Sequence, residues 1–336
     1  MTVLTHEPEK VERVEEKLEA VRAVRPFRTT ILAATDFTPA SERAFAFALG
    51  MAHRYGAELD IVHALPLDNV GMRSMVPVPH EMDTRRIEAE KQLHRAAKDA
   101  KTAGVANQVI LERGRVTEVI ADTACQLNAD LLVVGTHGRG GFKKLALGSV
   151  AESVLRMVEC PVLTVGEHVP LPASGVPEFH TILFATDFGP ASMKAWPYAL
   201  AIAKEYGSKL VLLHIVPPIG VVDSIPAAYE PAMYAAEDLI AKRDALRIAG
   251  LEHLKKLIPA DVKLAHEPKV MATAEFAAEG ILNTAAVHKA DLIVMGATPA
   301  KFAHAAAHDP WTVCHAILAK ATCPVLTVAG MEAKKN

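Results

Sequence analysis

Two segments of the sequence carry groups suited to binding a phosphorylated ligand. One is Ala34-Thr35-Asp36-Phe37, which follows a short apolar run, and the other runs from Gly135 to Gly141 and on to Gly148-Ser149. Glycine lets a phosphate approach backbone N–H groups closely, and the start of a helix after Gly148-Ser149 would add free N–H groups and a positive dipole end. Arg139 could neutralise phosphate charge, and the Asp36 carboxylate could accept hydrogen bonds from a ribose. These residue types predict a nucleotide site.

The two best-known phosphate-binding motifs are absent. The segment Gly135-x4-Gly140 is followed by Gly141, so it is not the G-x-x-x-x-G-K-[ST] of a P-loop. No G-x-G-x-x-G follows the first apolar run, so a dinucleotide-binding fingerprint is not supported.

An internal repeat organises the chain. Thr30-Ile-Leu-Ala-Ala-Thr-Asp-Phe returns as Thr181-Ile-Leu-Phe-Ala-Thr-Asp-Phe, and Cys160-Pro-Val-Leu-Thr-Val returns as Cys323-Pro-Val-Leu-Thr-Val. A repeat this long indicates a duplicated domain rather than a solenoid unit. We expect an N-terminal helical extension over 1–26, a first domain over 27–166, a Pro- and Gly-rich linker over 167–179 and a second domain over 180–330.

Short apolar runs alternate with helical patterns in both copies. In the first copy we expect strands near 30–34, 58–64, 107–112, 130–134 and 161–165, and helices near 40–55, 81–103, 116–128 and 149–158. In the second copy we expect strands near 181–185, 209–215, 261–266, 291–295 and 324–328. Strands that are apolar at every position are typical of a parallel sheet covered on both faces. In such a sheet, ligands bind beyond the carboxyl ends of the strands, where the strand order reverses.

Composition excludes several other classes of protein. The 336 residues have 36 Lys and Arg against 39 Asp and Glu, a net charge of −3, which disfavours nucleic-acid binding. The charged N-terminus lacks the apolar core of a signal peptide, and no long apolar run predicts a membrane span. Four cysteines are too few for a disulfide framework, so we expect a cytoplasmic protein with reduced thiols.

With these residues in place, the chain resembles a tandem universal stress protein with two UspA-type domains. The family's nucleotide motif is G-x2-G-x9-G-[ST], and Gly135, Gly138, Gly148 and Ser149 match it at every spacing. The resemblance implies two Rossmann-like (adenine nucleotide alpha hydrolase-like) α/β domains, each an open five-stranded parallel sheet in the order 3-2-1-4-5. It also implies bound ATP, with or without Mg²⁺, with the ribose on Asp36 and the adenine near the backbone of Ala64. The residues implied for the nucleotide are Ala34, Thr35, Asp36, Ala64, Gly135, Thr136, His137, Gly138, Arg139, Gly140, Gly141, Gly148, Ser149 and Val150.

The second copy departs from this motif. Pro299 stands where the second glycine belongs, and the alignment counted back from Cys323 puts Trp311 at the place of Gly148 and Thr312 at that of Ser149. Proline removes an N–H donor, and an indole ring fills volume that a phosphate needs. We therefore expect ATP in the first domain only.

The family resemblance also implies that final strands pair across a dimer interface. This chain holds two such strands, 162–165 and 325–328, so we expect them to pair within the chain as a pseudo-dimer and to cover edges that would otherwise be a liability. A homodimer and an unidentified protein partner remain open.

Three functions fit these observations. The first is a regulatory ATP-binding protein of the stress response that is not an enzyme, or that turns ATP over at most slowly. The second is a nucleotide-hydrolysing or adenylyl-transfer enzyme, which would need a base or a metal–carboxylate set near the phosphates. The third is a structural stress module that binds no nucleotide.

Five smaller features each have a structural and a functional interpretation. The stripe Val11, Val14, Leu18 and Val21 predicts a helix packed on its own domain or on another chain. His304, His308, Cys314 and His315 are metal-capable residues, although a structural role is favoured and no metal site is expected. His63 and His214 end equivalent strands, where a hydrogen-bonded histidine is the default. Cys160 and Cys323 are buried thiols or a redox pair, and the loops around 72–82 and 217–231 either line a ligand site or are ordinary surface loops.

Overall fold

The computed structural model describes residues 26–27, 29–67, 79–136, 147–171, 175–216, 232–259, 261–297 and 310–330. The expected extension over 1–25 and most of the loops after the second strand of each copy lie outside these ranges. Phe27 and Phe179 open the two copies with buried rings that pack on Tyr55 and Tyr206.

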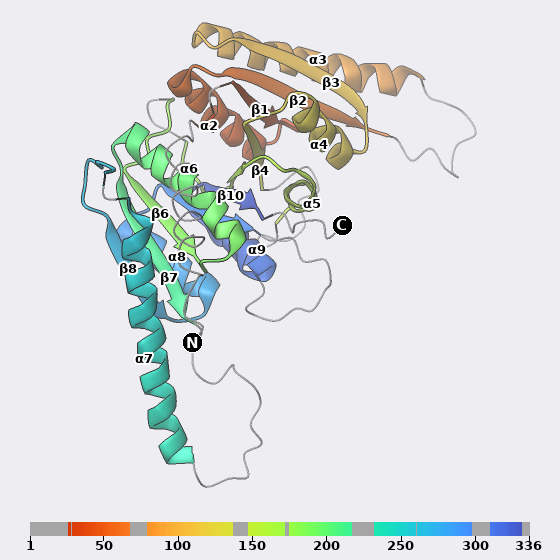
Figure 1. Cartoon of the computed structure of the whole chain (residues 1–336). Coiled ribbons are helices and arrows are strands. Elements are labelled where there is room, and N and C mark those ends of the chain that lie inside the picture. Colours follow the sequence, from red (N-terminus) through yellow and green to blue (C-terminus); the bar gives the residue numbers. More distant parts are fainter. Residues whose placement is uncertain are drawn as a thin grey trace, which may run out of the picture. The chain divides into compact units, whose positions relative to one another are not determined.

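The first copy alternates strands and helices, as expected (Figure 1). Its sheet has the order β3-β2-β1-β4-β5, every neighbouring pair is parallel, and the expected 3-2-1-4-5 order is confirmed. In chain order the elements are β1 (Thr30–Ala34), α2 (Pro39–Tyr55), β2 (Glu58–Pro66), α3 (Pro79–Thr102), β3 (Asn107–Gly114), α4 (Val116–Gln126), β4 (Leu131–Gly135), α5 (Ser149–Met157) and β5 (Val162–Val165).

The second copy repeats this plan in the order β10-β9-β6-β7-β8. Its helix α7 is the longest, and Figure 1 shows it running past the ends of β7 and β8. The elements are β6 (Thr181–Thr186), α6 (Pro190–Tyr206), β7 (Lys209–Val216), α7 (Ala232–Leu257), β8 (Lys269–Ala274), α8 (Ala277–His288), β9 (Leu292–Ala297), α9 (Pro310–Lys320) and β10 (Val325–Ala329).

The prediction of a strand at 261–266 is wrong. The strand that pairs with β7 is β8, which begins at Lys269, directly after Pro268. Residues 261–268 are turn and loop, although Val262 and Leu264 alternate with polar residues as in a strand. The register explains the difference: Gln108 pairs with Asp60 and Lys269 pairs with Val211, so the second copy holds about ten more residues before this strand.

The final strands pair as expected. β10 lies antiparallel to β5, with Leu326 opposite Leu163, and the Thr327 hydroxyl donates a hydrogen bond to the Val162 carbonyl. The chain divides into two compact units, and this pairing places the C-terminal segment from Ala297 in the unit that holds Phe27–Glu178. An edge that would otherwise expose unpaired N–H and C=O groups is thereby covered.

Local sequence signals position α2 at the carboxyl end of β1. Thr38 caps the helix by accepting a hydrogen bond from the Ser41 N–H, and Pro39 occupies the first turn, where its missing N–H costs nothing. Gly56 ends the helix with φ of 67°, a left-handed conformation that favours glycine.

A glycine at the end of β4 and of β9 lets each strand approach the next helix closely. A Cβ at Gly135 would lie 2.9 Å from the carbonyl carbon of Ala40, and one at Gly296 would lie 2.2 Å from the backbone nitrogen of Ser192. Neither neighbour is a flexible side chain, so only glycine fits. The helix starts of α2 and α6 are therefore held against the ends of β4 and β9.

We expect Gly296→Ala to lower the free energy of unfolding by about 2 kcal/mol, because a methyl group is forced against backbone atoms. Gly135→Ala should cost less, since its contacts are longer. Gly166→Ala is the matched control, because its Cβ would meet nothing closer than 3.6 Å. Urea unfolding measures all three, and wild-type stability in Gly296→Ala would contradict the packing.

Asp60 is a buried carboxyl in the middle of β2. It is 2% exposed, and its Oδ1 has no hydrogen-bond partner in the described part of the chain. Burial, with a smaller contribution from Glu58, raises its pKa to about 6. The second copy has Val211 at the same register position.

We expect Asp60→Val to raise the free energy of unfolding by about 2 kcal/mol above pH 7, because the fold no longer buries a carboxylate. The folded pKa lies above the unfolded one, so the penalty applies fully above pH 6 and disappears toward pH 4. The gain should shrink over that range. Urea titrations at pH 4.5 and 7.5 measure it, and an equal gain at both values would refute the assignment.

Candidate functional site

The strand order reverses between β1 and β4. β1 leads through α2 to β2 on one side, whereas β4 leads through α5 to β5 on the other. The chain therefore leaves these two neighbouring strands toward opposite sides, and in open parallel sheets ligands bind in a crevice at such a point, at the carboxyl ends of the strands. The two segments that the sequence singles out are the loops that follow these two strands.

The turn after β1 is fixed by three side chains. The Thr35 hydroxyl accepts a hydrogen bond from the Phe37 N–H at 3.0 Å, and Phe37 adopts a positive φ of 60°. Nδ1 of His63 donates to the Thr35 carbonyl at 2.7 Å, and its ring stacks at 4.5 Å on that of Phe37. His63 is thus hydrogen-bonded, as the sequence favours, but it does not end the strand, because β2 continues to Pro66.

The sequence did not predict that His63 holds the turn after β1 in place. The second copy repeats the turn with Thr186, Phe188 and His214, and its Nδ1 lies 2.9 Å from the Thr186 carbonyl. The signal was present in the sequence, because a histidine follows each Thr-Asp-Phe at the same spacing.

Asp36 projects from this turn toward the start of α2. Its Oδ1 accepts hydrogen bonds from the Thr38 N–H at 3.1 Å and from the Thr38 hydroxyl at 2.6 Å. Asp187 makes the equivalent contacts with the Gly189 N–H and the Ser192 hydroxyl. The carboxylate therefore stabilises a helix start in both copies.

The loop after β4 returns to the sheet at Gly148. The Gly148 N–H donates to the Thr136 carbonyl at 2.7 Å, and the Thr136 N–H donates to Val165 at 3.1 Å. Gly148 is the N-cap of α5 and carries no capping side chain. The first N–H of the helix that donates to a helical carbonyl is that of Glu152, and those of Ser149, Val150 and Ala151 have no partner within the described part of the chain. Among the described residues, the start of α5 thus presents three unpaired donors and a positive dipole end.

The other implied residues divide into two groups. Ala34 and Ala64 are buried at the ends of β1 and β2, and Gly135 ends β4 beside α2. His137, Gly138, Arg139, Gly140 and Gly141 lie outside the described residues.

The second copy differs in its helix start. α9 begins at Pro310, so Trp311 lies within its first turn and does not occupy an N-cap like that of Gly148. Proline favours the first helical position, which accounts for the earlier start. Pro299, with His304 and His308, lies outside the described residues.

The described residues contain no group of three or more metal-capable side chains. Cys314 is buried, and the Nε2 of its neighbour His315 lies 4.0 Å from Oε2 of Glu152. Burial raises the pKa of Cys160 to about 11 and those of Cys314 and Cys323 to about 12, so these thiols stay protonated at neutral pH.

A family model, that of the universal stress protein family, matches the sequence twice, over residues 28–166 and 178–329. The chain belongs to the universal stress protein family. The two matches make it a tandem member with two Rossmann-like α/β domains.

Curated relatives match this tandem protein over one domain length. Universal stress protein A homolog 1 of Coxiella burnetii is 34% identical over 138 residues, which cover 40% of this chain and 94% of the relative. A universal stress protein of Thermus aquaticus is 38% identical over 138 residues, covering 40% of this chain and 97% of its own.

A solved structure shows the same fold over most of the chain. A universal stress protein of Archaeoglobus fulgidus superimposes with a TM-score of 0.62 and 20% identity, covering 90% of this chain and 98% of its own. A further solved universal stress protein, in complex with cAMP, is 28% identical over 41% of this chain, with a TM-score of 0.32.

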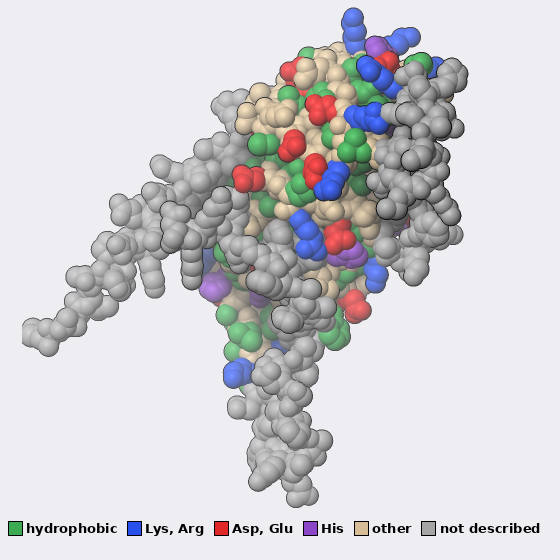
Figure 2. Space-filling view, turned by 90° about the vertical axis from the view of Figure 1, so that its right-hand side faces the viewer, with side chains coloured by type: hydrophobic (Ala, Val, Ile, Leu, Met, Phe, Trp, Pro, Cys, Tyr) green, Lys and Arg blue, Asp and Glu red, His purple; other side chains and the backbone are tan. Residues whose placement is uncertain are grey.

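The described surface and helices add two observations. On the face shown in Figure 2, the coloured basic and acidic side chains are intermixed. None of the described helices is long and apolar enough to span a membrane.

Thiol reactivity tests the assignment of the cysteines. Cys125 is the exposed one among the four, so at pH 8 we expect one thiol per native chain to react quickly with an aromatic disulfide reagent. All four should react after unfolding in urea. Cys125→Ser should remove the fast phase, and fast reaction of two or more thiols in the native protein would refute protonated, buried cysteines.

Proposed function

We propose that the first domain binds ATP at the crevice between the loops after β1 and β4, and that the bound nucleotide acts as a regulatory ligand in a stress response. The observation that carries the proposal is the start of α5, where three N–H groups have no capping partner among the described residues. Backbone donors at the positive end of a helix suit phosphate oxygens.

The backbone at Gly148 supports this assignment. Its φ of −62° and ψ of 140° are open to any residue, so the conformation does not require glycine. Room in front of the helix is the remaining reason for a residue without a side chain. At the start of α9, the sequence has Pro310 and Trp311 in place of a glycine.

Asp36 supplies the second part of the proposed site. It is half-buried at the adjoining loop, and Thr38 engages its Oδ1. We assign the ribose hydroxyls to this carboxylate and the adenine to the backbone near Ala64, as the family resemblance implies. The phosphates then lie toward Ser149 and Val150.

Calorimetric titration tests the placement. We expect about one tight ATP per chain, and Gly148→Trp should weaken binding about a hundredfold or more, because two or three hydrogen bonds to phosphate are lost. Gly148→Ala should have a smaller effect, and Trp311→Gly should not create a second tight site. Tight binding in Gly148→Trp would show that the nucleotide binds elsewhere.

The structural role of Asp36 requires its own control. Asp36→Ala should weaken ATP binding less than Gly148→Trp, because the phosphate contacts remain. Asp187→Ala removes the same helix-start contacts from the second domain and should leave ATP affinity unchanged. Equal losses in both would assign the effect of Asp36 to folding.

Three further readouts separate the proposal from its alternatives. Mass spectrometry of the denatured protein reports whether a nucleotide is retained through purification, and cAMP titrated beside ATP reports the preferred ligand. Incubation of the protein with ATP and Mg²⁺ should give at most slow turnover. Rapid hydrolysis would favour the alternative function, a nucleotide-hydrolysing enzyme.

A further inference from the structure

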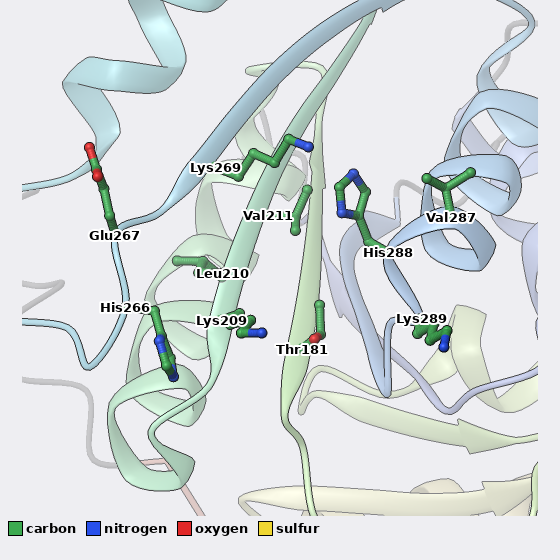
Figure 3. A pocket seen from close by; sticks show the side chains of 10 residues that line it. All are labelled: Thr181, Lys209, Leu210, Val211, His266, Glu267, Lys269, Val287, His288 and Lys289. Atoms are coloured by element: carbon green, nitrogen blue, oxygen red, sulfur yellow. The ribbon is translucent and has the colours of Figure 1, made fainter.

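The second domain holds a cavity of about 480 Å³ at the amino ends of its strands (Figure 3). This is the opposite end of the sheet from the loops after β6 and β9. The volume lies within the range of small-molecule sites. Its lining comes from the starts of β6, β7 and β8 and from the end of α8: Thr181, Lys209, Leu210, Val211, His266, Glu267, Lys269, Val287, His288 and Lys289.

The charge of this cavity is predominantly positive. Three lysines and two histidines line it against one acidic residue, Glu267. None of the three lysine ammonium groups forms an ion pair within the described part of the chain. Burial lowers the pKa of His288, and the charge of Lys269 lowers it further.

The fold itself does not require these lysines. Lys209 pairs with Thr181 as Glu58 pairs with Thr30, and Lys269 occupies the register position of Gln108. The residue before the shared Ala-Asp-Leu is Asn128 in the first domain and Lys289 in the second. One equivalent position is thus acidic and two are amides in the first domain, whereas all three are cationic in the second.

One of the three lysines occupies an unfavourable conformation. Lys289 has a φ of 51°, in the left-handed region that Asn128 adopts with a φ of 46°. Asparagine tolerates this region better than lysine does. The second domain therefore keeps a lysine at the C-cap of α8, where the backbone favours asparagine or glycine.

The floor of the cavity is apolar. Leu210 and Val211 are buried in β7, whereas Val287 is 77% exposed at the end of α8. Figure 3 shows His288 directed toward Val211 and Lys269. A ligand that fits both the positive charge and the apolar residues of the cavity has an anionic group and a compact apolar part.

We propose that this cavity binds a small organic phosphate, whose oxygens accept hydrogen bonds from Lys269 and His288 and whose organic part packs against Val211 and Val287. Lys209 and Lys289 add positive charge around the cavity from other sides. Phosphate suits a lysine, because charge-assisted hydrogen bonds are stronger than neutral ones. This site is separate from the proposed ATP site. It lies in the second domain at the amino ends of the strands, whereas the ATP site is proposed in the first domain at the carboxyl ends.

Phenyl phosphate is the probe, and amide chemical shifts in the full-length protein are the readout. We expect saturable shifts at 209–211 and 287–289, with an affinity about threefold or more above that of inorganic phosphate. Shifts that do not saturate, or an affinity no higher than that of inorganic phosphate, would overturn the proposal.

The first domain provides the test variant. Lys209→Glu, Lys269→Gln and Lys289→Asn together install its residues, and we expect them to weaken phenyl phosphate binding about tenfold or more with thermal stability no lower than that of the wild type. Lys204→Glu, Lys242→Gln and Lys320→Asn make the same charge change at exposed positions outside the cavity and should alter binding by less than about twofold. Equal losses in both sets would overturn the site in favour of general charge attraction. Gly148→Trp should leave phenyl phosphate binding intact, so failure of the ATP proposal and failure of this one are distinguishable.

Discussion

The candidate site depends on the close approach of the end of β4 to the first turn of α2. Gly135 permits this contact, because any side chain there would meet the backbone of Ala40 and Ser41. Ser41 is in turn within hydrogen-bond distance of the hydroxyls of Thr35 and Thr38. The end of β4 and the turn after β1 are therefore parts of one packed cluster, which brings the two diverging loops together at the edge of the sheet.

Duplication shows which parts of this cluster are structural. The second domain keeps Gly296 and the turn of Thr186, Phe188 and His214, with similar distances. Its helix start differs, since α9 begins at Pro310. The Thr-Asp-Phe segment and the first motif glycine are thus explained by packing alone, whereas the first domain is distinguished by Gly148 before α5, where the second domain begins α9 with Pro310 and Trp311. The basic cavity of the second domain is the converse case, a charged surface built on positions that the first domain fills with Glu58, Gln108 and Asn128.

The sequence predicted most of this architecture because the repeat could be compared with itself. The strand order and the pairing of 162–165 with 325–328 are confirmed, since continuous apolar strands and shared motifs constrain them strongly. The predicted position of β8 was wrong. An insertion of about ten residues could lie on either side of that strand, and the alternation of apolar and polar residues at 261–266 favoured the wrong side. Three features depend on contacts between residues that are distant in the sequence: the hydrogen bond of His63 to Thr35, the burial of Asp60, and the lining of one cavity by three lysines. Periodicity carries no information on such contacts.

Amide hydrogen exchange with and without ATP tests the central claim most directly, because it reads the individual N–H groups that are assigned to the phosphates. The account predicts slower exchange with saturating ATP at Ser149, Val150 and Ala151 and at the turn of Thr35 and Asp36. Exchange at Thr312, Val313 and Cys314 at the start of α9 should not change. Equal slowing at both helix starts, or slowing at α9 alone, would contradict the asymmetric site.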